Sequence, residues 1–221
     1  RGVDDDQFEI DLFIIRRRIE KIALDHHIKE FYVCSLSCRT VVYKGMFLAE
    51  QLTAFFPDLL DERFISSFAI FHQRYSTNTF PTWRLAQPFR LLAHNGEINT
   101  IKGNANWMKS HETRAASKVF DEFNEEIFPL IEPGASDSMA LDSVIEALVH
   151  AGRPMPAAQC MLVPESWSHR PHMPQTHRDF FAYCNCVIEP WDGPAALAAS
   201  DGRWVIASMD RNGLRPLRYS V

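Results

Sequence analysis

Two short polar segments interrupt apolar sequence, at residues 72–79 (HQRYSTNT) and at residues 94–99 (HNGEIN). In the second segment, the side-chain amide of Asn95 and the backbone N–H of Gly96 could donate to one oxygen, as in the oxyanion hole of an acyl-transfer enzyme. A hairpin turn uses the same Asn-Gly pair, so both interpretations stay open. His94 fits a buried, hydrogen-bonded histidine better than a general base.

The first polar segment places an arginine at the end of an apolar stretch. A buried guanidinium needs an anionic partner, so we expect Arg74 to meet a carboxylate of either the protein or a ligand. Taken alone, a structural ion pair is the more ordinary choice. The hydroxyl of Thr77 could bind the same anion or could make a local turn bond.

A third candidate is Asp137, in the segment GASDSMALD. Its carboxylate either caps the following helix or receives an ammonium group, and the cap is the usual role. Together, a carboxylate binder, an oxyanion pair and an ammonium binder match a free α-amino acid with a side-chain amide. Glutamine is such a ligand.

Composition limits the class of protein. The 221 residues are 46% hydrophobic and 23% charged, with a net charge of −5, so the chain can bury a sizeable core. No basic run resembles a nucleic-acid-binding stripe, no apolar run is long enough to span a bilayer, and the acidic start is unlike a signal peptide. We therefore predict a soluble protein of the cytoplasm or plastid stroma, with no nucleic-acid or membrane partner.

The 5 cysteines have no disulfide-framework spacing, so we expect free thiols. Cys184 and Cys186 with nearby histidines invite a zinc interpretation, but the spacing matches no standard ligand pattern, and we predict no metal site. The opening RGVDDDQ lacks an initiator methionine, and we expect the chain to be a piece of something longer.

Periodicity predicts the elements that must position these residues. Phe8, Leu12, Ile15, Ile19 and Ile22 recur at helical spacing between residues 4 and 23. Helices are also predicted over residues 101–113 and 137–150, the latter capped by Ser136 or Asp137, and within 157–167 and 177–191. Strands are predicted at 30–37 and 39–45 as a hairpin, at 65–74, at 91–97, and as short tail strands at 195–200, 203–208 and 214–220. This order predicts an α+β domain in which a mostly antiparallel sheet packs against outer helices.

The longer motifs carry a resemblance. The segments HQRYSTNTFPTWRLAQPFRLLAHNGEINTIKGNANWM, SDSMALD, MLVPESW, EPWDGPAAL and DRNGLRPLRY resemble the glutaminase domain of the large chain of glutamate synthases, which are class II glutamine amidotransferases. The resemblance implies the N-terminal-nucleophile (Ntn) hydrolase fold, an αββα sandwich. Residues 1–221 would form the C-terminal major part of one such domain.

The resemblance also implies residue roles. Arg74 would bind the α-carboxylate of glutamine with help from Thr77, and Tyr75 would shape the pocket. Asn95 and Gly96 would form the oxyanion hole, and Asp137 would hold the α-amino group. The family's nucleophile is an N-terminal cysteine whose own α-amino group is the general base, whereas this sequence begins with Arg1. We therefore expect the segment alone to be inactive.

For the intact protein, the resemblance implies hydrolysis of L-glutamine and transfer of the ammonia to 2-oxoglutarate by further synthase domains of the same chain. It implies FMN and an iron–sulfur cluster outside this segment, with electrons from an NAD(P)H-oxidising small subunit or from ferredoxin. Two alternatives stay open: a non-catalytic glutamine- or glutamate-binding domain, and an unrelated hydrolase that uses an internal cysteine.

Overall fold

The computed structural model describes residues 2–75 and 80–221, apart from the side chain of Glu122. Its sheet has three antiparallel strands in the order β1 (Leu92–Gly96), β2 (Ala195–Ser200) and β3 (Val205–Met209). The register pairs His94 with Leu197 and Gly96 with Ala195. The predicted strands at 91–97, 195–200 and 203–208 are confirmed, as is the hairpin turn between the last two.

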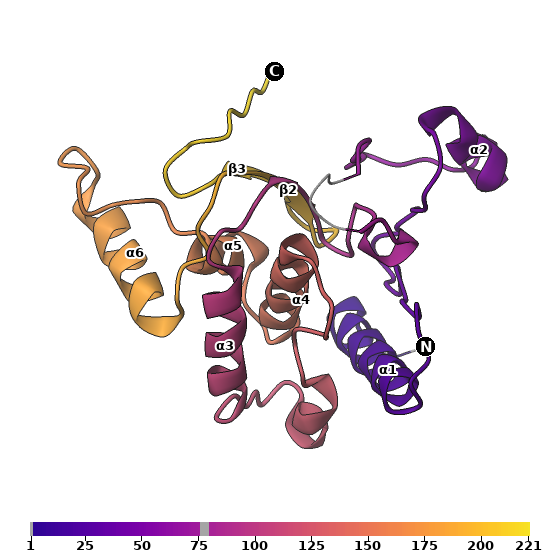
Figure 1. Cartoon of the computed structure of the whole chain (residues 1–221), viewed down its shortest axis with the longest axis horizontal. Coiled ribbons are helices and arrows are strands. Elements are labelled where there is room, and N and C mark those ends of the chain that lie inside the picture. Colours follow the sequence, from indigo (N-terminus) through magenta and orange to yellow (C-terminus); the bar gives the residue numbers. More distant parts are fainter. Residues whose placement is uncertain (1, 76–79) are drawn as a thin grey trace.

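Helices α1, α3, α4, α5 and α6 lie below this sheet in Figure 1, with α3, α4 and α5 closest to it, α1 beside α4, and α6 extending away, whereas α2 lies apart at the upper right. The α-helices are α1 (Asp5–Asp25), α2 (Leu52–Phe55), α3 (Ile101–Glu112), α4 (Asp137–His150), α5 (Met155–Leu162) and α6 (Gln175–Val187). The short 3-10 helices are η1 (Ala49–Gln51), η2 (Pro57–Leu60), η3 (Trp83–Leu85) and η4 (Asp121–Ile127). Sheet and helices form an α+β arrangement, as predicted.

Helix α4 forms the centre of the core. The Ser136 hydroxyl caps it by accepting the Met139 backbone N–H, and Leu141, Val144 and Ile145 are fully buried. Burying one such side chain contributes about 1.5–3 kcal/mol, so this helix is firmly anchored. It is the helix from which the candidate site is held.

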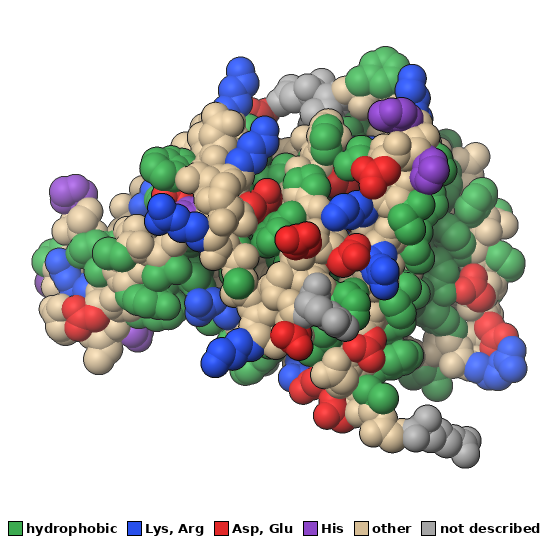
Figure 2. Space-filling model, turned by 90° about the horizontal axis from the view of Figure 1, so that it is seen from below, with side chains coloured by type: hydrophobic (Ala, Val, Ile, Leu, Met, Phe, Trp, Pro, Cys, Tyr) green, Lys and Arg blue, Asp and Glu red, His purple; other side chains and the backbone are tan. Residues whose placement is uncertain are grey.

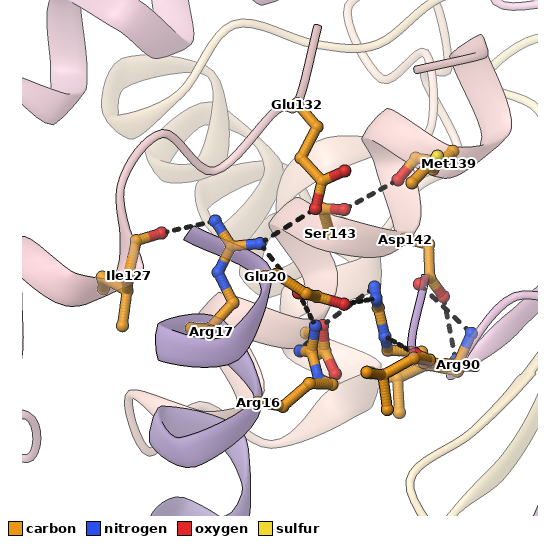
Figure 3. Close-up of polar contacts among 12 residues, drawn as sticks. Arg16, Arg17, Glu20, Arg90, Ile127, Glu132, Met139, Asp142 and Ser143 are labelled. Carbon is orange, nitrogen blue, oxygen red and sulfur yellow. Dashed lines mark hydrogen bonds and ion pairs between the residues drawn. The ribbon is translucent and has the colours of Figure 1, made fainter. Parts of the chain in front are cut away.

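The helix predicted between residues 4 and 23 is confirmed as α1, but most of the apolar residues that predicted it do not face the core. Phe8, Ile15, Ile19 and Ile22 are exposed, and the buried face of α1 is largely charged. Figure 3 shows how the charges are satisfied: Glu20 lies between the guanidinium groups of Arg16 and Arg90 and pairs with both. The second Arg16 nitrogen, Nη2, pairs with Glu146 of α4 at 2.6 Å. Paired charges of this kind can be buried, and they turn α1 so that its apolar face points outward.

The strands predicted at 30–37, 39–45, 65–74 and 214–220 are also wrong, because the structure assigns no strand there. The chain does reverse near Ser37, whose hydroxyl accepts the backbone N–H groups of Arg39 and Thr40 at 3.0 and 3.1 Å. Apolar side chains of the third segment remain exposed, Ile65 at 88% and Phe71 at 82%. Strand composition reflects packing on a neighbour, so composition alone did not produce a ladder.

The surface seen in Figure 2 mixes acidic and basic side chains with hydrophobic ones and carries no broad area of a single charge. Among the helices of residues 2–75 and 80–221, none combines the length and apolar composition of a membrane span.

Candidate functional site

Asn95 and Gly96 lie in β1, paired with Ala196 and Ala195. The hairpin-turn interpretation of this pair is therefore wrong. Gly96 has a φ of +156°, and a Cβ at this position would lie 1.9 Å from the carbonyl oxygen of Pro194. Only glycine fits so close to a neighbouring backbone.

The loop that follows β1 is held by the segment before β2. The Glu97 N–H donates to Pro194 O at 2.9 Å, and the Asn99 N–H donates to Asp192 O at 2.8 Å. A Cβ on Gly193 would lie 2.0 Å from the Glu97 carbonyl oxygen, so this second glycine is also required for the close approach. The segments HNGEIN and WDGPA thus fit together backbone to backbone.

One edge of β1 carries no strand within the described residues. Successive N–H groups of a strand point to opposite edges. Because the Glu97 N–H points toward the β2 side, those of residues 92, 94, 96 and 98 point to the open edge. Side chains accept three of them: Asp142 accepts from Leu92 at 3.1 Å, Gln87 from His94 at 2.6 Å, and Asp137 from Ile98 at 2.8 Å. The fourth, the Gly96 N–H, has no acceptor among the described residues.

Asp137 is the first residue of α4, and Ser136 is the cap. The cap role considered for Asp137 therefore belongs to Ser136. Asp137 Oδ2 accepts the Ile98 N–H, and Asp137 Oδ1 accepts the Ser138 N–H at 2.8 Å. A half-buried carboxylate at a helix N-terminus is stabilised by the helix dipole, so Asp137 is a suitable anion for an ammonium group.

His94 is buried, with 2% of its surface exposed, and its Nδ1 lies 2.7 Å from Ser138 Oγ. This confirms the expectation of a buried, hydrogen-bonded histidine. Burial lowers the His94 pKa, and the charge of Asp137 opposes that shift. The effect of burial is the larger, and the lowered pKa favours the neutral form of the ring. Its backbone is held too, because Gln87 accepts from the His94 N–H and donates to the His94 carbonyl oxygen.

Asp142 is a functional support that the sequence did not reveal. It is fully buried in α4 and accepts the backbone N–H groups of Leu91 and Leu92 at 2.9 and 3.1 Å and that of Arg90 at 3.2 Å (Figure 3). Burial, followed by the charge of Glu146, raises its pKa to about 6. The available signal was an acidic residue between buried apolar positions of a core helix.

Arg74 is exposed and makes no ion pair with a described residue, so the structure shows neither the burial nor the protein partner considered for it. Tyr75 accepts the Thr82 N–H at 3.2 Å through its hydroxyl. Burial lowers the pKa of His72, and the side chain of His72 makes a hydrogen bond with the backbone of His94. This bond places the chain just before Arg74 beside β1. Thr77 lies outside the described residues.

None of the five cysteines lies in β1, in the loop after it or in the first turn of α4. Cys34 and Cys38 lie in the loop after α1, Cys160 lies in α5, and Cys184 and Cys186 lie in α6. Burial raises the pKa of Cys160 and Cys184, which keeps both thiols protonated. Within the described part of the chain, no group of three or more His, Cys, Asp or Glu side chains is placed to hold a metal ion.

A cavity of about 480 Å³ lies elsewhere, between α1, the loop at 34–42 and the turn at 201–204. No residue of β1 and none of the first turn of α4 lines this cavity. The candidate site is therefore defined by the open edge of β1, where hydrogen-bond donors and an anion converge, rather than by this hollow.

Comparison with known proteins gives matches along the whole chain. Residues 1–221 match the family described as class-II glutamine amidotransferases. The chain is 62% identical over its full length to the glutamate synthase [NADPH] large chain of Azospirillum brasilense, and 46% identical over 218 residues to that of Bacillus subtilis. It is 50% identical over 218 residues to the chloroplastic ferredoxin-dependent glutamate synthase of Spinacia oleracea. It spans 15%, 14% and 13% of these three relatives, respectively.

Proposed function

Because this chain belongs to the class-II glutamine amidotransferases, we propose that it forms the glutaminase part of a glutamate synthase large chain. The reaction is hydrolysis of L-glutamine to glutamate and ammonia. The observation that carries this proposal is the Gly96 N–H, the one amide on the open edge of β1 without an acceptor among the described residues. It lies next to the exposed side chain of Asn95.

The chemistry follows from these donors. A cysteine thiolate, which the family resemblance places at the mature N-terminus of the intact protein, attacks the amide carbon of glutamine. The carbonyl oxygen becomes an oxyanion, and Asn95 and Gly96 donate to it. Collapse of this intermediate breaks the carbon–nitrogen bond as the α-amino group of the cysteine, which had taken the thiol proton, returns that proton to the nitrogen, and ammonia leaves. Water then hydrolyses the thioester to glutamate and restores the thiol. The donors act where charge develops, which favours the transition state over the substrate.

Substrate binding is assigned by the same proposal. Asp137 faces the α-amino group, and Arg74 binds the α-carboxylate. Thr77 assists Arg74, and Tyr75 shapes the pocket. The exposed guanidinium of Arg74 and the half-buried carboxylate of Asp137 are compatible with these roles. Together they select a free amino acid over a protein side chain, since both termini of the ligand are used.

The larger context rests on the relatives. We propose that the ammonia passes to 2-oxoglutarate in further synthase domains, and that sheet and helices belong to an αββα Ntn-hydrolase arrangement in the intact protein. FMN and an iron–sulfur cluster would serve those domains, as the resemblance to glutamate synthases implies. Relatives named for NADPH and for ferredoxin both match, so either electron donor fits, as does a cytoplasmic or a stromal location.

The test is glutamine-dependent ammonia release by the intact gene product, with its N-terminus verified by mass. Asn95→Ala should lower kcat by about 10²–10³ with little change in KM, because the donor acts on the transition state. Asn99→Ala is the matched control: it removes the same side chain from an exposed position in the loop that follows β1. Glutamine binding without ammonia release in the wild type would instead identify a non-catalytic binding domain.

A further inference from the structure

Two contacts from the first turn of α4 reach β1 and the loop after it, on either side of the Asn95-Gly96 pair. On one side, Ser138 Oγ meets the ring of His94 at 2.7 Å. On the other side, Asp137 Oδ2 accepts the Ile98 N–H at 2.8 Å. The two contacting side chains are also joined to each other, because Ser138 Oγ lies 3.2 Å from Asp137 Oδ1. The Asn95-Gly96 pair is thus held on both sides by hydrogen bonds from α4, through His94 before it and Ile98 after it.

The hydrogen-bond directions follow from the donor inventory. Asp137 as a carboxylate only accepts, so the Ser138 hydroxyl donates to it. Ser138 Oγ then accepts from the Nδ1–H of His94, which leaves His94 Nε2 as a bare acceptor. The opposite tautomer would bury an Nε2–H donor, and His94 Nε2 has no partner among the described residues. Leaving a buried donor unsatisfied is unfavourable, so we assign the hydrogen bonds as follows: His94 donates to Ser138, and Ser138 donates to Asp137.

We propose that His94 and Ser138 are positioning residues of the oxyanion hole, acting through Asn95 and Gly96. This inference rests on the proposed function and deepens it. Donors that stabilise an oxyanion must be fixed before the charge develops, and side chains locked by their own hydrogen bonds provide such fixation. Helix α4 is a suitable anchor because Met139, Ala140 and Leu141, which follow Ser138 in the helix, are almost completely buried.

The same arrangement links the two ends of the substrate. A carboxylate offers about four lone-pair sites. In Asp137, one serves Ile98 and two serve the N–H and O–H of Ser138. The remaining site is available for the α-ammonium group of glutamine. Asp137, to which the proposed function gives recognition of the amino acid, therefore also holds the loop that follows the oxyanion pair.

A pair of serines gives the decisive comparison in the intact gene product. Ser138→Ala removes the link to His94, whereas Ser136→Ala removes only the helix cap on Met139. We expect Ser138→Ala to lower kcat about tenfold with the KM for glutamine changed by less than about twofold, and Ser136→Ala to retain kcat. Equal loss of kcat in both variants would show that only helix stability matters, and would overturn the proposal.

Two histidine variants separate the ring nitrogens. His94→Asn places an amide donor near the Nδ1 position and preserves the bond to Ser138, whereas His94→Gln places its amide near Nε2. The proposal requires kcat of His94→Asn to exceed that of His94→Gln by about fivefold or more. The reverse order would assign the role to Nε2 instead and exclude the link through Ser138.

Hydrogen exchange tests the support independently of activity. In the intact protein, the amides of residues 94–100 should exchange faster in Ser138→Ala than in Ser136→Ala, measured by mass spectrometry of peptides. Equal exchange would overturn the proposal. If the wild type releases no ammonia from glutamine, the proposed function fails, yet the exchange comparison still decides whether α4 holds this loop.

Discussion

Asp142 Oδ1 accepts the backbone N–H of Leu92 at 3.1 Å, so a side chain from the centre of α4 fixes the beginning of the strand that carries the candidate site. Asp142 has no exposed surface, and Figure 3 shows it beside the buried cluster of Arg16, Arg17, Glu20 and Arg90. The strand is thus tied to the charged core of the domain.

The raised pKa of Asp142, about 6, predicts how stability depends on pH. The folded state binds the proton more tightly than the unfolded state, where the value is near 3.8. The stabilisation from this group is therefore fully present below pH 3.8 and is lost as pH rises through about 6. The loss amounts to about 3 kcal/mol at most. Urea unfolding of wild type and Asp142→Asn at several pH values measures it: the difference between the two curves should change between pH 4 and about 7, and a constant difference would contradict the assignment.

Gly193→Ala should be strongly destabilising, by about 1–3 kcal/mol, because the new methyl group would meet the Glu97 carbonyl oxygen. It should also lower glutaminase activity, since the displaced loop follows the oxyanion pair directly. Gly103→Ala is the control: it lies inside α3 with nothing within 4 Å of the new Cβ, and it should stabilise by about 0.5–1 kcal/mol. Urea unfolding compares the two, and equal effects would refute the steric argument.

Arg74→Ala should weaken glutamine binding by roughly 1.5–3 kcal/mol, the range for hydrogen bonds to charged groups. Isothermal titration with glutamine measures this effect. Arg218→Ala removes an exposed arginine elsewhere on the surface and should leave affinity unchanged. Unchanged affinity in a folded Arg74→Ala variant would remove the carboxylate-binding role.

The buried ion cluster predicts non-additive mutations. Arg16→Ala or Glu146→Ala alone should destabilise by about 3–5 kcal/mol, because each takes from a buried charge one of its partners. The double variant should lose less than the sum of the two single losses, since both members of the 2.6 Å pair are then removed together. Asp61→Ala is the control: it breaks an exposed pair with Arg63, and the unfolding midpoint should stay the same. Additive losses would mean that the two residues are not coupled.

Local signals predicted the elements that local interactions determine. The Ser136 cap marked the start of α4, and Asp201-Gly202 marked the turn between β2 and β3. The face of α1 was not predictable, because Glu146 and Arg90, far along the chain, supply the partners of its buried charges. The strands at 30–45 and 65–74 failed for a related reason, since a strand exists only where another pairs with it.

The candidate site shows the same division. The motif HNG identified the Asn95-Gly96 pair, but its conformation depends on the contact of Gly96 with Pro194. Local preference favoured a turn, whereas tertiary pairing placed the residues in a strand. Asp142 was missed because no local pattern distinguishes an acid that binds distant backbone amides from any other charged residue of a helix. The oxyanion role of Asn95 and Gly96 stays a prediction, as do the binding roles of Arg74, Tyr75, Thr77 and Asp137.

The contacts of Asp137 and Asp142 with the backbone fix the number of residues that α4 can have between them. Asp142 holds the beginning of β1 and Asp137 holds the loop after its end, so the two carboxylates must reach their separate backbone partners from fixed angular positions on the helix. Each residue of an α-helix advances about 100° around the axis. A single insertion or deletion between the two would turn one carboxylate away and release one end of the strand, even if every apolar side chain found a place. The length of this helical segment is therefore as restricted as the identity of its residues.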